Sequence, residues 1–172
     1  MPSGTALLTH NANLCRATAD HVEFTSRGVA QIDNAPATVP PTVTKWITDG
    51  ALVIVAMDGP KLAGVLFTSE KAQASALPVV AMLKAWPGSA DAYVYGPVCV
   101  DQAARGLGVL EAMYAHALAC LPGREAVLFI NAGNTRSLKA HARLGMVQVA
   151  DFTLGEQAFA VLSSRREDPV RK

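Results

Sequence analysis

Charged residues are scarce in this chain, and neither sign dominates. Only 17% of the 172 residues are Asp, Glu, Lys or Arg, the formal net charge is +1, and no dense run of Lys and Arg precedes the C-terminal tail. A nucleic-acid partner is therefore not expected, because such a partner needs concentrated positive charge. Hydrophobic residues make up 51% of the chain, which excludes a disordered chain and indicates an α/β interior.

Cysteine is also rare, and the apolar runs are short. Cys15, Cys99 and Cys120 form no CxxC pair, which favours reduced thiols in a cytoplasmic protein. The longest uninterrupted apolar run, Ala51–Met57, is far shorter than the ~20 residues of a membrane span. The N-terminus shows no basic region followed by an apolar run, so no signal peptide is evident. We expect a soluble, cytoplasmic protein.

Hydrophobic periodicity predicts one domain over residues 1–172, with a charged tail at 165–172. Apolar runs between turn residues predict strands at 51–57, 62–68, 92–100, 126–130, 147–152 and 158–163. Helical spacing and flanking Pro, Gly or capping residues predict helices at 40–49, 75–86, about 106–121, and 134 or 135 to 143. Residues 13–17 are either a first strand, followed by a helix after Thr18, or part of one longer helix.

Two of these helices carry specific expectations. Ser75 is the expected cap of the 75–86 helix. The apolar face of that helix is Val79, Met82, Leu83 and Trp86. The helix that starts near Gly106 has apolar residues at helical spacing, namely Leu107, Leu110, Tyr114, Ala117, Leu118 and Leu121.

The order of the elements predicts a mixed, mostly antiparallel sheet flanked by helices. Asp58-Gly59-Pro60 predicts a β-hairpin between the strands on either side of it. The 106–121 helix joins two strands that should be parallel neighbours. Gly96-Pro97 predicts a bulge or a break in pairing within the first of these. The last two strands should form a closing antiparallel pair, and the single parallel step leaves a place where central strands can splay apart.

The segment 98–110 leads from a strand through a polar loop into a helix. A helix start exposes backbone N–H groups without partners and carries partial positive charge. Gly106 and Gly108 would let a phosphate approach these groups, and Arg105 would add a full charge. An ordinary strand-to-helix turn, in which glycine only relieves strain, explains the same spacing.

Here the chain resembles the GNAT superfamily of acyl-CoA-dependent N-acyltransferases. The family's phosphate loop, Gln/Arg-x-x-Gly-x-Gly/Ala after its fourth strand, is matched by Arg105 and Gly108, whereas Leu110 replaces the usual small residue. Downstream, the family has an Asn at a helix start, a Tyr seven residues later and a Gly-aromatic ending. Asn134 fits this pattern, with His141 in place of Tyr and a Gly-Met ending. The resemblance covers residues 50–163.

The resemblance implies acetyl-CoA as the acyl donor and a primary amine of a small molecule or amino-acid derivative as the acceptor. It assigns the pantetheine arm to the backbone of Val98, Cys99 and Val100. The pyrophosphate would bind the amides of Arg105, Gly106, Leu107, Gly108, Val109 and Leu110. Further cofactor contacts fall to Asn131, Asn134 and Ser137. No metal site is implied, and a homodimer is possible in the family.

Acetyl transfer needs a neutral amine, a stabilised carbonyl oxygen and a proton for the departing thiolate. In the family a Tyr commonly supplies that proton, and His141, with an ordinary pKa about 6.5, can do the same. The alternative is that His141 belongs to a structural hydrogen-bond network. Tyr95 is the candidate catalytic residue on the preceding strand, although a core role fits it equally. Cys99 suggests a covalent acyl-enzyme, but no histidine is placed by sequence to activate it.

Two other functions fit parts of the pattern. A dinucleotide-binding fold would have glycine where Glu111 stands and an acidic residue at the end of the next strand, where Asn131 stands. A non-catalytic acyl-CoA-binding or sensor domain on the same fold is compatible with the departures at Leu110 and His141.

Overall fold

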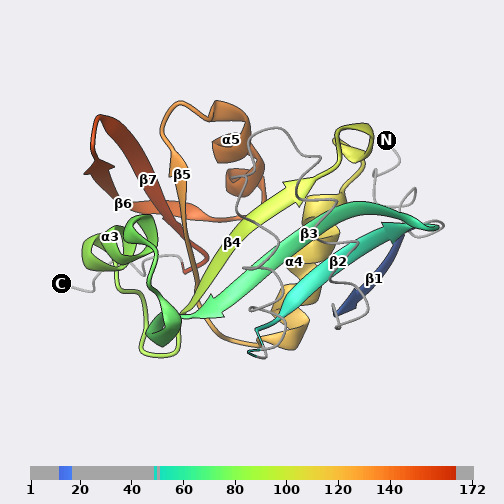
Figure 1. Ribbon diagram of the computed structural model, residues 1–172, viewed down its shortest axis with the longest axis horizontal. Helices are drawn as coiled ribbons and strands as arrows, with labels where there is room; N and C mark the ends of the chain where they lie inside the picture. Colours follow the sequence, from blue (N-terminus) through green and yellow to red (C-terminus); the bar gives the residue numbers. More distant parts are fainter. Residues whose placement is uncertain (1–11, 17–48, 50, 166–172) are drawn as a thin grey trace. The chain divides into compact units, whose positions relative to one another are not determined.

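The computed structural model describes residues 12–16, 49 and 51–165 (Figure 1). Its seven strands form a sheet in the order β1-β2-β3-β4-β5-β7-β6. The strands are β1 (Ala12–Arg16), β2 (Val53–Asp58), β3 (Lys61–Glu70), β4 (Tyr93–Val100), β5 (Ala126–Asn131), β6 (Val147–Leu154) and β7 (Gln157–Ser163). The helices are α3 (Leu77–Ala85), α4 (Val109–Cys120) and α5 (Thr135–Arg143), with short 3-10 turns η2 (Lys71–Gln73) and η3 (Gln102–Ala104).

The mixed, mostly antiparallel sheet confirms the predicted fold class. β2 and β3 pair antiparallel around Gly59 and Pro60, as the hairpin prediction required. β6 and β7 form the predicted closing pair, and β5 pairs antiparallel with β7. β4 and β5 are parallel. Residues 12–16 are a strand paired with β2, which decides between the two predictions for that segment.

The parallel ladder between β4 and β5 is short. Its pairs are Tyr93 with Ala126 and Val94 with Val127, although β4 extends to Val100. Gly96 has a φ of 111° and Pro97 has no N–H to donate. The predicted local break at this dipeptide is therefore confirmed.

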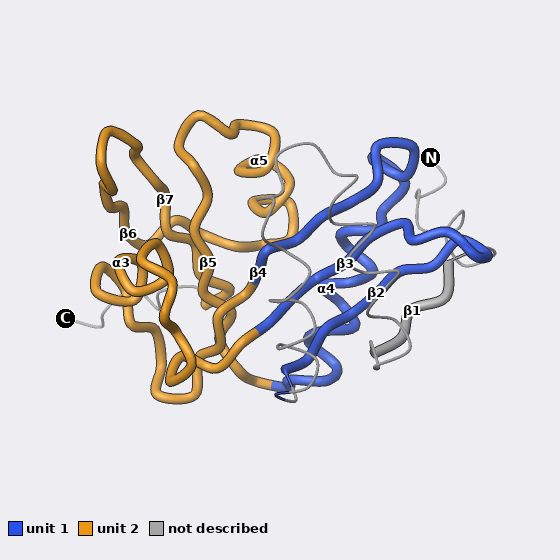
Figure 2. The backbone as a smooth tube through the Cα atoms, viewed as in Figure 1, with its two compact units in different colours: residues 1–68, 96–122 blue, residues 69–95, 123–172 orange. Residues whose placement is uncertain are grey.

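The chain forms two compact units (Figure 2). The first comprises residues 1–68 and 96–122. In it, helix α4 lies beside β1 and β2, and its buried residues include Val109, Met113 and Ala117. These residues recur every fourth position, so they share one face of the helix. β2 contributes the buried run Val53–Ala56.

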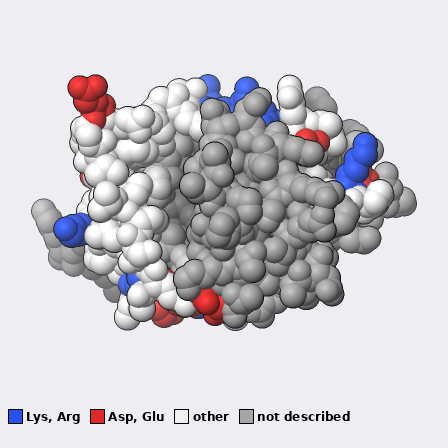
Figure 3. All heavy atoms as spheres, viewed as in Figure 1, with Lys and Arg blue, Asp and Glu red and all other residues white. Residues whose placement is uncertain are grey.

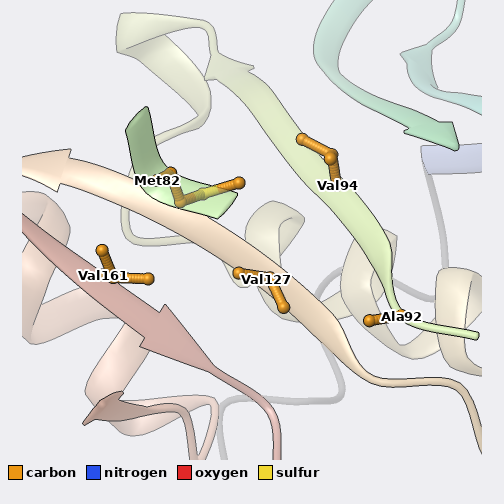
Figure 4. Close-up of a cluster of buried hydrophobic side chains, with 5 residues drawn as sticks. All are labelled: Met82, Ala92, Val94, Val127 and Val161. Carbon is orange, nitrogen blue, oxygen red and sulfur yellow. The ribbon is translucent and has the colours of Figure 1, made fainter. Parts of the chain in front are cut away.

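The second unit comprises residues 69–95 and 123–172. Its core is a cluster of five buried side chains, shown in Figure 4: Met82, Ala92, Val94, Val127 and Val161. The predicted apolar face of α3 packs here, since Val79, Leu83 and Trp86 lie against this cluster. Val94 faces α3, whereas its neighbour Tyr95 contacts His141 of α5. Because side chains alternate along a strand, α3 and α5 cover opposite faces of this part of the sheet.

Two details of the predicted helices are wrong. Helix α3 begins at Leu77 after Ala76, and no side chain caps it, so Ser75 does not have the expected role. Helix α4 begins at Val109 rather than near Gly106, because Gly108 adopts the left-handed conformation immediately before it. The expected apolar face is correct at Tyr114 and Ala117, which are buried, and wrong at Leu107 and Leu118, which are 50% and 41% exposed. The helices predicted after Thr18 and at 40–49, and the tail beyond Arg165, lie outside the described residues.

Among the described helices, none is both long and apolar enough to cross a membrane. Cys99 and Cys120 are free thiols, as predicted. On the face drawn in Figure 3, the described charged side chains of both signs lie in small separate groups.

Candidate functional site

The loop between β4 and α4 is held by one backbone hydrogen bond and one side-chain hydrogen bond. The Asp101 N–H donates to the carbonyl of Ala63 on β3 (2.9 Å). After η3, Arg105 is extended, and its Nε donates to the Val100 carbonyl (3.4 Å). Arg105 is exposed, so its guanidinium lies at the surface of the loop.

The start of α4 presents backbone N–H groups without side-chain caps. The amides of the first turn, Val109 to Glu111, have no partner inside any α-helix, and no side chain in the described part of the chain caps this helix. At Gly106, with a φ of 77°, a built Cβ would meet nothing within 4 Å. The loop thus offers amide donors, the partial positive charge of the helix start and the full positive charge of Arg105, all in one compact unit. This arrangement fits a diphosphate.

Cys99 lies just before this loop and is half-buried. Burial raises the pKa of the Cys99 thiol, so the thiol form is favoured. A thiolate is the nucleophile that a covalent acyl-enzyme would need. Burial therefore opposes a covalent acyl-enzyme at Cys99.

Helix α5 in the second unit is capped by a predicted site residue. The Asn134 side-chain oxygen accepts from the Ser137 N–H (3.2 Å), which is the N-cap bond that asparagine favours. Asn131 at the end of β5 similarly accepts from the Gly133 N–H (2.9 Å). Both side-chain oxygens thus already accept one backbone hydrogen bond within the loop or helix start.

His141 and Tyr95 lie together in the second unit. Their rings are perpendicular, with centroids 5.6 Å apart, and both residues are buried, at 2% and 3% exposed. The His141 Nδ1 lies 2.8 Å from the Ser137 carbonyl and 3.3 Å from the Ser137 hydroxyl. Burial lowers the pKa of His141, and its hydrogen bond to the Ser137 carbonyl raises it by less. The ring is therefore neutral at pH 7.

The predicted site residues thus fall into two groups, each within one unit. The loop residues and the end of β4 belong to the first, and Tyr95, Asn131, Asn134, Ser137 and His141 belong to the second. Sequence reasoning missed Gly64 on β3, which contacts the start of α4 closely. A glycine inside a strand often marks such a close approach, so the signal was present.

No protein-family model matches the sequence, and no curated protein is significantly similar to it. Many solved structures are similar in fold. A GNAT-family acetyltransferase from Bacillus cereus ATCC 10987 gives a TM-score of 0.70 at 12% identity, covering 90% of this chain and 97% of that one. The ribosomal-protein-S18-alanine N-acetyltransferase of Escherichia coli gives 0.67 at 13%, covering 94% and 99%.

Arabidopsis thaliana NAA60, solved in complex with acetyl-CoA, gives a TM-score of 0.65 at 11% identity, covering 88% of this chain and 97% of that one. The chain has the GNAT fold. Its mostly antiparallel sheet differs from the parallel sheet that a doubly wound dinucleotide-binding domain requires. The observed sheet therefore excludes the doubly wound dinucleotide-binding fold.

Proposed function

We propose that this chain is a single-domain N-acetyltransferase that transfers the acetyl group of acetyl-CoA to a primary amine. The acceptor is a small molecule or amino-acid derivative, and the amine attacks directly in a ternary complex. One observation carries the proposal: in a GNAT fold, the loop before α4 has uncapped helix amides, Arg105 and an open position at Gly106. A cytoplasmic location and a homodimer remain predictions.

The cradle of residues 105–110 would hold the coenzyme A diphosphate through the amides at the start of α4 and the Arg105 charge. The amides of Arg105 and Leu107 take no part in this cradle, because they donate to the carbonyls of Gln102 (3.3 Å) and Ala104 (3.4 Å). The backbone of Val98, Cys99 and Val100 would bind the pantetheine arm, and Asn131, Asn134 and Ser137 would make further contacts. Acetyl-CoA supplies an activated acyl group as a thioester. Of the chain's own groups, His141 is assigned to proton transfer and Tyr95 to the same catalytic site.

Calorimetry at low salt tests the binding step. Wild-type protein should bind acetyl-CoA, and Arg105→Ala should weaken binding by about fivefold, since an exposed charge contributes about 1 kcal/mol. Arg143→Ala is the matched control, because Arg143 is also exposed but lies at the end of α5. Absence of binding to any acyl-CoA would overturn the assignment.

A panel of amines tests the reaction. Release of the coenzyme A thiol on mixing protein, acetyl-CoA and amine identifies an acetyltransferase, and the best acceptor identifies the substrate class. Tight binding with no thiol release for any amine would instead establish the sensor alternative. Replacing His141 with Phe should lower turnover more than it lowers acetyl-CoA affinity.

A further inference from the structure

The hydrogen bond between His141 and Ser137 fixes the tautomer of the imidazole ring. A carbonyl oxygen only accepts, so His141 Nδ1 must donate across the 2.8 Å contact with the Ser137 carbonyl. In a neutral ring the proton therefore sits on Nδ1, and Nε2 carries a lone pair. The Ser137 hydroxyl also lies on the Nδ1 side, at 3.3 Å.

Nε2 of His141 has no hydrogen-bond partner within the described residues, although it is fully buried. Native proteins rarely leave a buried polar atom unpaired, and such atoms often have a ligand or catalytic role. A lone pair needs a donor. An amine N–H and a thiol S–H are the two donors that an acetyl transfer brings to its site.

We propose that Nε2 of His141 carries both proton transfers of the acetyl transfer, first as acceptor and then as donor. This rests on the proposed function. The amine nitrogen bonds to the acetyl carbon, and Nε2 takes one proton from that nitrogen. The C–S bond then breaks, its electron pair stays on sulfur, and Nε2–H gives the proton to the sulfur. The products are an amide and a free thiol, and the ring is neutral again.

This differs from the tyrosine of the resembled family, which donates a proton that it already holds. A neutral His141 holds its proton on Nδ1, engaged with the Ser137 carbonyl, so Nε2 must collect a proton before it donates one. Burial favours the neutral ring by lowering the pKa of His141. The histidine is therefore suited to a base that becomes an acid, rather than to an acid alone.

The surroundings of the ring are uncharged in the described part of the structure. From β4, the titratable group that contacts it is Tyr95. On its own helix, Arg136, Lys139 and Arg143 are all exposed. Burial and the Ser137 hydrogen bond alone account for the shift in the pKa of His141. An acidic limb below the ordinary histidine pKa can therefore be assigned to the imidazole.

Nitrogen-15 NMR of the ring tests the tautomer without any substrate. Protein labelled on histidine should show a protonated Nδ1 and a bare Nε2 at pH 7.5. Resonances are assigned with His141→Gln, and His116→Gln, on α4 and outside the site, is the matched control. A neutral ring protonated on Nε2 would overturn the proposal.

The pH dependence of turnover tests the relay. Wild-type kcat should fall as pH decreases through the pKa of His141, because the protonated ring cannot accept a proton. His141→Gln should lower kcat by about 10²–10⁴-fold, remove that acidic limb and leave the Kd for acetyl-CoA within about twofold. His141→Tyr should be as slow as His141→Gln, since a neutral phenol is not a base.

Three kinetic outcomes would overturn the relay alone: turnover that is lost as pH rises through the pKa of His141, near-normal turnover in His141→Tyr, or an acidic limb that persists in His141→Gln. If both His141 variants fail to fold, two wild-type measurements still test the relay: the protonation of the ring nitrogens by NMR, and whether kcat falls as pH decreases or as pH rises. Failure of the wild type to bind acetyl-CoA would instead overturn the proposed function, and the ring measurement does not depend on it.

Discussion

Gly64 on β3 lies directly against Val109, the first residue of α4. A Cβ built at Gly64 would be 2.8 Å from Cγ1 of Val109, 2.9 Å from Cε of Met113 and 3.2 Å from the Cys99 carbonyl oxygen. The Met113 methyl is the end of a flexible side chain and can move, whereas a valine methyl is fixed to the helix by a stiff side chain. The missing side chain at Gly64 therefore sets how closely the start of α4 approaches the sheet.

Gly64→Ala should destabilise the protein and weaken acetyl-CoA binding together. Overpacking of this kind costs about 1–3 kcal/mol, and relief requires Val109 to shift away from β3. The amides of the proposed cradle shift with it. Denaturant unfolding measures the first effect, and calorimetry should show a several-fold weaker Kd.

The double variant Gly64→Ala/Val109→Ala provides the control. Shortening Val109 removes the nearest clash, so the two substitutions should couple favourably by about 0.5–3 kcal/mol, as expected for residues in contact. If the stability losses of the two single variants simply add in the double variant, the contact between Gly64 and Val109 is not the cause of the destabilisation.

A substitution at Gly106 can distinguish the effect of backbone strain on stability from the effect of a side chain on phosphate binding. Gly106 and Gly155 have φ values of 77° and 62°, and a Cβ at either would meet nothing within 4 Å. Alanine at either position should cost about 1–2 kcal/mol of stability, because a side chain disfavours the left-handed region. Only Gly106→Ala should also weaken acetyl-CoA binding, by about tenfold, whereas Gly155→Ala, in the β6–β7 turn, should leave it unchanged. Equal affinities in the two variants would argue against a phosphate at Gly106.

Much of the fold could be predicted from local signals. Asp58-Gly59 marks the β2–β3 turn, and Asn134 marks the start of α5, where its side chain makes the expected cap. Gly96-Pro97 marks the end of the β4–β5 ladder. In each case one or two residues have a conformational or hydrogen-bonding preference that few other structures satisfy.

The sequence-based predictions are wrong or incomplete where the same residues are compatible with several structures. Helix α4 is apolar on nearly every side, so periodicity alone could not identify the buried face, and the left-handed Gly108 moved its start to Val109. The perpendicular contact of Tyr95 with His141 joins residues far apart in sequence. Motif spacing could propose each of these two residues, but neither their contact nor the protonation of Nδ1 follows from spacing.

Glu125 leads to a prediction about stability outside the proposed site. This carboxylate is 4% exposed and accepts from Trp86 Nε1 (3.0 Å), the Ser89 N–H (2.6 Å) and the Ser163 hydroxyl (2.6 Å). Burial alone would raise the pKa of Glu125, but these hydrogen bonds outweigh it and hold the pKa below its usual value.

Glu125→Gln should lower the free energy of unfolding by about 1–3 kcal/mol, because the new NH2 group cannot accept a hydrogen bond from these donors. Glu70→Gln is the matched control. Glu70 pairs with Arg124 at 2.7 Å, but its side chain is 55% exposed, so its loss should cost at most about 1 kcal/mol. Chemical denaturation measures the free energy of unfolding of both variants. Similar losses in the two would show that the ionised Glu125 carboxylate does not contribute more to stability than the exposed Glu70 does.

The lowered pKa of His141 predicts that acid destabilises the protein by a defined route. The unfolded chain has an ordinary histidine pKa of about 6.5, so below that pH it binds a proton that the folded ring resists. Stability should therefore be constant above about pH 6.5 and fall as pH decreases toward the pKa of the folded protein, by at most about 1.4 kcal/mol per pH unit. Unfolding free energies measured from pH 7.5 to 5 should show this slope in wild type and in His116→Gln, and His141→Gln should lose it. Since carboxylates such as Glu125 lose their contribution at lower pH, a slope that persisted in His141→Gln across this range would assign the acid sensitivity to another group.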